Sequence, residues 1–243
     1  MNIIKLSAID STNSYLKRLV KEGIASDELI ITTDNQTLSR GQQGASWQFQ
    51  EGKSLAFSVL KSFDTMPIQG QFNIAMATSL GVQKALQKLG ISEVKIKWPN
   101  DILSDRNKLC GILIENIVKG DSIKESIIGI GLNVNETDFN NLPNATSMKL
   151  RSGIQHNLDN VLDIVANAVL KELDLLKTMD EKLLKHDYES QLFRKNEISR
   201  FKDVAGNKFN GTIAGVTESG QLRIKTKENN EQQYSLKEIT LYY

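Results

Sequence analysis

The sequence has 243 residues, of which 40% are hydrophobic and 24% charged, as is ordinary for a soluble globular protein. Its 30 basic and 29 acidic residues give a net charge of +1, which excludes binding of nucleic acid or an anionic membrane through a strong overall field. The single cysteine, Cys110, excludes an intrachain disulfide and lies in an apolar run typical of a core strand. With no apolar leader and no stretch of 18 apolar residues, we expect a cytoplasmic protein.

The first predicted elements are a helix followed by two strands. Ser11 is a good N-cap for a helix whose apolar residues fall on one face, and Gly23 predicts the end of that helix. Residues 29–33 and 54–60 are typical of strands. The segment 34–53 between them is rich in Gly, Gln and Ser without any periodicity, and long loops of this kind usually carry function. We therefore expect it to form a lid over an active site.

The rest of the chain predicts further helices and strands, and then a change of pattern. The apolar periodicity predicts helices at about 70–89, 157–176 and 180–193, and strands at 94–98, 109–118 and 126–134. The last two strands are so apolar that we expect them to be central in the sheet. From Asn196 onward, short β-like pieces alternate with Gly and Asn turns. We therefore expect an α+β protein with a catalytic domain over residues 1–195 and a small β-barrel domain over residues 196–243.

Four segments contain more glycine, lysine and amide side chains than a plain core requires. The first is the loop from Gln36 to Trp47, in which glycines allow the backbone to approach a ligand and Arg40 is the only charged residue. Trp47 is suited to anchor the far end of this loop in the core. An ordinary surface loop would give the same pattern.

The second segment, Lys97-Trp98-Pro99-Asn100-Asp101, follows a predicted strand. Proline cannot continue a central ladder, so the strand must stop at this point. Lys97 and the Asn100-Asp101 pair are then expected at the edge of the sheet. A simple turn is the other interpretation.

The third segment runs from Lys108 to Glu115, so that a lysine and a glutamate bracket an apolar strand. Lysine at the start of a strand is often only solvated. Gly111, within the strand, has no side chain to pack, which indicates that another group approaches the backbone there.

The fourth segment, residues 129–135, has two glycines at alternate positions of a strand, which exposes one flat face. It lacks the third glycine and the following helix of a dinucleotide-binding fingerprint. Asn133 lies on the same face by the period of two and is positioned to reach a phosphate or ribose. Neither His156 nor His186 has a partner at metal-ligand spacing, and no Ser-His-Asp or Cys-His arrangement is present, so zinc and acyl-enzyme chemistry are not indicated.

Taken in this order, and preceded by Asp10-Ser11-Thr12-Asn13, the four segments resemble the biotin protein ligase family. The marks of that family are an STN turn, a Gly/Arg-rich adenylate loop, KWPND, KxxGIL(x)E and a GxGxN strand. The resemblance runs from about Ile9 to residues 145–148 and continues weakly into the C-terminal barrel. Two usual arginines of the adenylate loop are replaced by Gln42 and Ala45. Because the chain begins almost at the STN turn, we expect the monofunctional type, without an N-terminal helix-turn-helix domain.

The resemblance implies a fold and an activity. The fold is a mixed-sheet catalytic domain like that of class II aminoacyl-tRNA synthetases, followed by an SH3-like β-barrel. The activity is that of an ATP-dependent biotin protein ligase, which forms biotinyl-5′-AMP and transfers biotin to a lysine of a biotin carboxyl carrier protein of a biotin-dependent carboxylase. The substrates are ATP and biotin, with Mg²⁺. No DNA or membrane partner is implied, and a homodimer is compatible with the family.

The resemblance also implies roles for individual residues. The biotin-binding residues would be Ser11, Thr12, Asn13, Gln36, Arg40, Gly41, Gln42, Lys108 and Gly111. The ATP- and adenylate-binding residues would be Arg40, Trp47, Lys97, Asn100, Lys108 and Asn133. The catalytic residues would be Lys108, Arg40, Lys97 and Asp101. Cations in this set suit the chemistry, because a carboxylate that attacks an α-phosphate brings two anions together.

Three alternatives remain open at this point. Lipoate or octanoate ligation uses the same fold, although KWPND and GxGxN favour biotin. A nucleic-acid-binding module is suggested by basic residues in the C-terminal barrel, but acidic residues accompany them and no row of stacking aromatics is present. A protein that binds biotin without catalysis is the third alternative, and biotin-dependent pyrophosphate exchange would separate it from a ligase.

Overall fold

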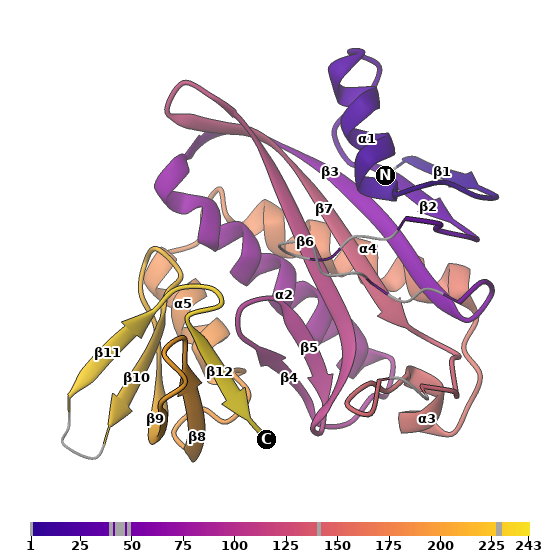
Figure 1. The fold of residues 1–243 in the computed structure, drawn as a ribbon. Coiled ribbons are helices and arrows are strands. Elements are labelled where there is room, and N and C mark those ends of the chain that lie inside the picture. The colour runs from indigo at the N-terminus through magenta and orange to yellow at the C-terminus, as the bar shows by residue number, and fades with distance from the viewer. Residues whose placement is uncertain (1, 39–40, 42–46, 48–49, 140–141, 227–229) are drawn as a thin grey trace.

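The computed structural model describes residues 2–38, 41, 47, 50–139, 142–226 and 230–243. Within these residues the chain forms a seven-stranded sheet with helices on both faces, followed by a five-stranded sheet (Figure 1). A mixed α+β fold with a C-terminal β-sheet domain was expected from the sequence and is confirmed.

The large sheet has the strand order β1-β2-β3-β7-β6-β5-β4. Its strands are β1 (Asn2–Leu6), β2 (Leu29–Thr33), β3 (Ser54–Pro67), β4 (Val94–Lys97), β5 (Asp101–Ser104), β6 (Asn107–Lys119) and β7 (Ser122–Asn133). Strands β1 and β2 pair in parallel, and all other neighbours are antiparallel. The two most apolar predicted strands, β6 and β7, lie in the interior of the sheet as expected, because strands buried on both faces carry few polar side chains.

The described helices are α1 (Thr12–Lys21), α2 (Gln71–Lys88), α3 (Met148–Ser152), α4 (Leu158–Leu175) and α5 (Glu181–Ser190), with a 3₁₀ turn at Ile68–Gly70. All of them except α3, which was not predicted, begin and end close to the predicted positions. Ser11 caps α1 by accepting a hydrogen bond from the Ser14 N–H, and Gly23 follows the helix with a φ of +73°. No helix in the described part of the chain is long and apolar enough to cross a membrane.

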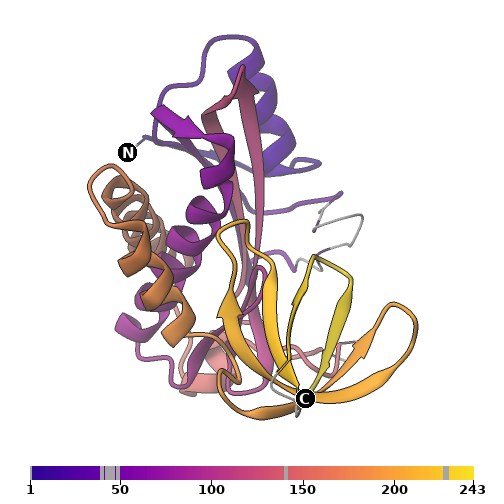
Figure 2. The same ribbon diagram turned by 90° about the vertical axis from the view of Figure 1, so that its left-hand side faces the viewer.

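The alternation of side chains along β2 divides the hydrophobic core between the two faces of the sheet. Ile30 belongs to the larger cluster with α2 and α4, whereas Leu29 and Ile31 belong to a smaller cluster with Leu16 and Leu19 of α1. Figure 2 shows α1 on the face of the sheet opposite α2 and α4. The N-terminal turn of α1 therefore packs against strands β3 and β7 on the face opposite α2 and α4. This face, which α1 covers only in part, is called the open face of the sheet.

The C-terminal sheet is antiparallel throughout and has the order β11-β10-β9-β8-β12. Its strands are β8 (Ile198–Asp203), β9 (Lys208–Val216), β10 (Leu222–Thr226), β11 (Glu231–Tyr234) and β12 (Ile239–Tyr242). Phe201 is fully buried within it and stacks on Phe209 with ring centres 5.7 Å apart. The short strands separated by turns correspond to the β pattern that begins after residue 195 in the sequence.

The C-terminal sheet is joined to the first part of the chain by specific polar contacts. The Trp98 indole N–H donates to the Gly220 carbonyl at 2.8 Å, and the Val216 N–H donates to the Glu189 carboxylate at 2.9 Å. A Cβ on Gly220 would lie 2.4 Å from the ring of Phe72, so only glycine fits at this contact. Trp98 belongs to the KWPND segment, and the C-terminal sheet thus contacts the hairpin that carries it.

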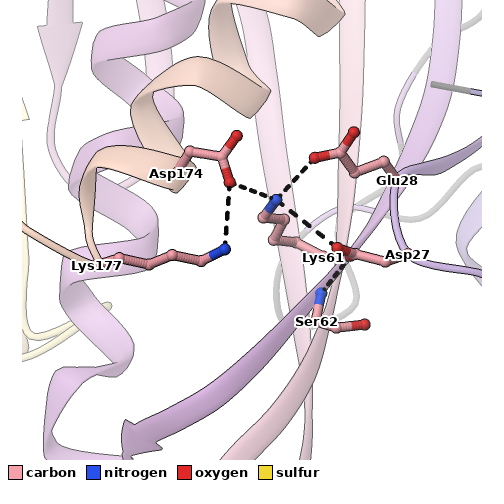
Figure 3. A network of polar contacts seen from close by, with 6 residues as sticks. All are labelled: Asp27, Glu28, Lys61, Ser62, Asp174 and Lys177. Carbon is pink, nitrogen blue, oxygen red and sulfur yellow. Dashed lines mark hydrogen bonds and ion pairs between the residues drawn. The ribbon is translucent and has the colours of Figure 1, made fainter.

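A buried lysine links strand β3 to helix α4 on the helical side of the sheet (Figure 3). The side chain of Lys61 is 1% exposed, and its ammonium donates to Asp174 at 2.7 Å and to Glu28 at 2.9 Å. Burial by itself lowers the pKa of Lys61, but the hydrogen bonds to Asp174 and Glu28 outweigh it and leave the pKa raised above 10.5. The lysine therefore remains charged and ties three segments of the chain together.

We expect Lys61→Met to lower the free energy of unfolding by about 2 kcal/mol, because it leaves the carboxylates of Glu28 and Asp174 without their shared cation. The two carboxylates are partly exposed and regain hydration, so the loss stays below that of a fully buried pair. Urea unfolding measures the change. The matched control is Lys177→Ala, which removes an exposed lysine 3.8 Å from the same Asp174. Equal losses in the two variants would contradict the role of Lys61.

Candidate active site

A cavity of about 190 Å³ on the open face of the large sheet gathers segments that are distant in the sequence. Ten of the residues that the sequence assigned to the site line it: Ser11, Thr12, Asn13, Gln36, Gly41, Trp47, Asn100, Asp101, Lys108 and Gly111. Apolar and glycine residues complete the lining: Ala56, Phe57, Ile112, Leu113, Gly129, Ile130 and Gly131. A concave, largely apolar site with a few convergent polar groups is typical of small-molecule binding.

The STN turn enters this cavity at the start of α1. The backbone N–H of Thr12 donates to Gln36 Oε1 at 3.0 Å, and the Thr12 hydroxyl lies 2.7 Å from the Ser58 hydroxyl. Gln36 is brought there by a parallel bridge to Ile9, which extends the pairing of β1 and β2. The segment after β2, the N-cap of α1 and the middle of β3 thus meet at one wall of the cavity.

Two glycines form a flat platform on which the ring of Trp47 lies. Gly111 of β6 and Gly131 of β7 are register partners. A Cβ on Gly131 would lie 2.7 Å from the indole, and one on Gly111 would lie 3.0 Å from it. The prediction that another group approaches the backbone at Gly111 is confirmed. In this structure that group is the Trp47 indole.

Charged groups meet at the other end of the cavity. Lys108 Nζ lies 2.7 Å from Asp101 Oδ1 and 5.4 Å from the centre of the Trp47 ring. Asn100 Nδ2 donates to the Ile112 carbonyl at 2.7 Å, which fixes the hairpin against β6. Among the described lining residues, Lys108 is the one cation and Asp101 the one carboxylate. Asp101 therefore fixes the position of a lysine whose ammonium has further N–H groups to donate to an anionic ligand.

Other predicted site residues lie elsewhere. Lys97 is absent from the cavity lining; its Nζ lies 3.9 Å from Asp101 Oδ2 and 5.0 Å from the centre of the Tyr243 ring. Asn133 is buried and donates to the Thr146 carbonyl at 3.0 Å instead of lining the cavity. Arg40 and Gln42 lie outside the described residues, as do several other residues of the predicted lid over residues 34–53. The roles assigned to these residues stay predictions.

Cys110 and His156 lie outside the cavity lining. Cys110 is fully buried, as expected for a core residue, and burial raises the pKa of its thiol. Burial lowers the pKa of His156, whose ring nitrogen lies 2.9 Å from the Ser152 hydroxyl. No group of three or more His, Cys, Asp or Glu residues in the described part of the chain is arranged to hold a metal ion.

Two polar residues behind the cavity were not assigned to the site from the sequence. Ser58 is fully buried and contacts both Thr12 and Asn13, whereas Glu115 accepts a hydrogen bond from the Asn13 side chain at 2.9 Å. Glu115 is part of the KxxGIL(x)E segment, so a signal for it was present in the sequence. No local pattern marks Ser58.

The model of the biotin/lipoate A/B protein ligase family matches residues 6–133, which is more than half of the chain. The chain belongs to the biotin/lipoate A/B protein ligase family. The resemblance read from the ordered motifs is thereby confirmed, and the matched segment contains every motif from the STN turn to the GxGxN strand.

Several curated proteins and solved structures are similar to this chain. The bifunctional ligase/repressor BirA of Bacillus spizizenii is 27% identical over 96% of this chain and 72% of its own length. The biotin–[acetyl-CoA-carboxylase] ligase of Mycobacterium tuberculosis is 30% identical over 57% of this chain and 51% of its own length. The solved structure of the Aquifex aeolicus biotin protein ligase in complex with biotin and ATP is 28% identical, with a TM-score of 0.79 over 99% of this chain and 98% of that one.

Proposed function

We propose that this member of the biotin/lipoate A/B protein ligase family is an ATP-dependent biotin protein ligase. It forms biotinyl-5′-AMP and transfers biotin to a lysine of a biotin carboxyl carrier protein. The observation that carries this proposal is the single cavity in which the STN turn, the KWPND hairpin, Lys108 and the paired glycines of β6 and β7 meet. The similarity to biotin ligases over nearly the whole chain supports it.

In the first step, a carboxylate oxygen of biotin attacks the α-phosphorus of ATP. A bond forms between that oxygen and phosphorus, the bond to the bridging β-phosphate oxygen breaks, and pyrophosphate leaves. Because two anions must approach one another, a fixed cation beside them lowers the barrier. Lys108 occupies such a position in the cavity, and we assign it this role. Arg40 and Lys97 are assigned to the same anions from the sequence.

In the second step, the neutral amine of a carrier lysine attacks the acyl carbon, and AMP leaves with the electrons of the mixed-anhydride bond. The attacking nitrogen also loses a proton, which passes to solvent water as the amide forms. Asp101 is the carboxylate nearest to this chemistry, and it lies in the cavity wall within hydrogen-bond distance of Lys108. We assign Asp101 to the positioning of the incoming amine.

Mg²⁺ belongs to this proposal as part of the ATP substrate. With Asp101 the only carboxylate among the described lining residues, the site fits an ion held mainly by phosphate oxygens and water. We also propose that the large sheet is related in fold to the catalytic domain of class II aminoacyl-tRNA synthetases and that residues 196–243 form an SH3-like domain. The protein would act on a carboxylase carrier in the cytoplasm.

The test of this function is exchange of labelled pyrophosphate into ATP. Because adenylate formation is reversible, biotin should stimulate exchange, and lipoic acid should do so at least about tenfold less well at equal concentration. Attachment of biotin to a carrier protein should then consume the adenylate. Exchange that depends on lipoic acid and not on biotin would assign the chain to the other branch of the family. Biotin binding without any exchange would mark a binding protein.

A further inference from the structure

We propose that Glu115 sets the direction of a buried hydrogen-bond relay through Asn13, Ser58 and Thr12. The relay turns the Thr12 hydroxyl into a hydrogen-bond acceptor for an N–H of the cyclic urea of biotin, so that Glu115 and Ser58 are positioning residues for this ligand. The inference deepens the proposed function, because it identifies residues behind the cavity that position a group that binds biotin.

The relay starts at the side-chain amide of Asn13. One end of this amide faces the Glu115 carboxylate at 2.9 Å and the Leu113 carbonyl at 3.3 Å. Both neighbours can only accept hydrogen bonds, so the amide nitrogen must point toward them. The oxygen of Asn13 is thereby fixed in the opposite direction, toward Ser58.

Ser58 connects Asn13 to Thr12 and fixes the direction of the next hydrogen bond. Its hydroxyl lies 2.6 Å from Asn13 Oδ1 and 2.7 Å from Thr12 Oγ1, but it has only one hydrogen to donate. Because Asn13 Oδ1 can only accept, that hydrogen belongs to the contact with Asn13. The remaining contact requires the Thr12 hydroxyl to donate to Ser58.

Thr12 then presents lone pairs to the cavity that it lines. Its hydroxyl has a second possible acceptor, Gln36 Oε1, but this atom is 3.3 Å away and Ser58 Oγ is 2.7 Å away. Gln36 Oε1 accepts from the Thr12 backbone N–H at 3.0 Å, so the side-chain amide nitrogen is the polar group of Gln36 that is left to bind a ligand. Thr12 and Gln36 therefore supply an acceptor and a donor to the same cavity. A ligand with an N–H beside a carbonyl matches this pair.

Burial keeps water from reversing the relay. Ser58 is fully buried, and Thr12 and Asn13 are 4% and 3% exposed. The Asn13 side chain also packs directly against the backbone of Gly129, where a Cβ would lie 2.4 Å from the Asn13 side-chain oxygen. Only Glu115 reaches partly exposed surface, where Lys17 Nζ lies 3.3 Å from its other oxygen. The carboxylate is thus the fixed end of the relay.

The test uses Ser58→Ala, which breaks the relay, and Glu115→Ala, which removes its fixed end. Each should weaken binding of biotin about five- to tenfold in titrations without ATP, the effect of one misdirected hydrogen bond. The KM for biotin in pyrophosphate exchange should rise by the same factor with kcat nearly unchanged. Desthiobiotin, which keeps the cyclic urea and lacks the sulfur ring, should lose affinity equally. A selective loss for biotin alone would overturn recognition at the urea.

Two controls separate the relay from a general disturbance of the fold. Glu115→Gln keeps an oxygen that accepts from Asn13, so it should restore most of the affinity lost in Glu115→Ala. Lys17→Ala removes only the exposed partner of Glu115 and should bind biotin like the parent protein. Affinity as low in Glu115→Gln as in Glu115→Ala would contradict the relay.

The decisive experiment is a double-mutant cycle with Thr12→Val, which removes the hydroxyl at the cavity end and keeps the shape of the side chain. If Ser58 acts through Thr12, Ser58→Ala should have no further effect on biotin affinity in the Thr12→Val background. Additive losses, or parental affinity in both Ser58→Ala and Glu115→Ala, would overturn the proposal. Failure of the function itself would be distinguishable, because the parent protein would then show no biotin-dependent exchange.

Discussion

Lys108→Ala is expected to fold normally and to form biotinyl-adenylate at least about 100-fold more slowly than the parent protein. A preorganised electrostatic donor at a developing anion is worth roughly 3 kcal/mol, and Lys108 is the only cation among the described residues that line the cavity. The backbone contacts of Lys108 with Asn144 and Thr146 do not involve its side chain, so strand β6 should keep its register. The rate of adenylate formation in a single turnover measures the effect.

Lys108→Arg is the matched variant for this prediction. It keeps the charge and changes the reach and geometry of the donor, so it should recover part of the lost rate. Thermal unfolding at the parental temperature would establish that Lys108→Ala is folded. Near-parental adenylate formation by Lys108→Ala would remove Lys108 from the mechanism.

Gly131→Val is expected to lower kcat/KM for ATP at least about 30-fold. A Cβ at residue 131 would lie 2.7 Å from the Trp47 indole, so the ring must leave the platform formed by Gly111 and Gly131. Stacking of a base on an aromatic ring is worth about 1–3 kcal/mol, and the sequence assigns Trp47 to the binding of ATP. Steady-state kinetics with ATP as the varied substrate measure the loss.

The effect of this substitution should depend on Trp47. In a Trp47→Ala background, Gly131→Val should cause little additional loss, since the ring that it displaces is already absent. Ile128→Val is the matched control, because Ile128 lies on the same strand and packs into the core beneath the sheet. If Gly131→Val still lowered kcat/KM about 30-fold in the Trp47→Ala background, the loss would not arise from displacement of the Trp47 ring.

Elements with strong local signals are predicted well from this sequence. Ser11 and Gly23 give the two ends of α1, and α4 begins at Leu158, one residue after the predicted start at residue 157. Strand β3 extends to Pro67, beyond the predicted end at residue 60. Polar residues interrupt the apolar run there, whereas pairing with β7 continues and keeps the chain extended.

Elements that depend on distant partners were not predicted. Strand β1 is an edge strand with largely exposed side chains. It is stabilised by parallel pairing with β2, which follows α1 along the chain. Strand β5 has only four residues and forms between β4 and β6. The one-turn helix α3, Met148–Ser152, is too short to show a period.

The site shows the same division between local motifs and long-range contacts. The order of the motifs predicts that Thr12, Gln36, Asp101 and Lys108 share a cavity, although they are distant in the sequence. The relay was not predictable, because Asn13 reaches Glu115 across 102 positions of the chain, and side-chain contacts of this range follow from the register of the strands. Motifs indicate which chemistry is present, and only the fold indicates which groups orient it.

The contact between Trp98 and Gly220 makes the position of the active-site hairpin depend on the C-terminal sheet. Trp98 stands between Lys97 and the Asn100-Asp101 pair, and its indole is held by a backbone carbonyl of the C-terminal sheet. Gly220 has no freedom to acquire a side chain, because the ring of Phe72 fills the space beside it. A side chain at residue 220 would push against Phe72 and shift the carbonyl that holds Trp98, so a substitution at this turn would displace the hairpin that carries Asp101. Residue 220 can therefore influence the geometry of the cavity although it does not line it.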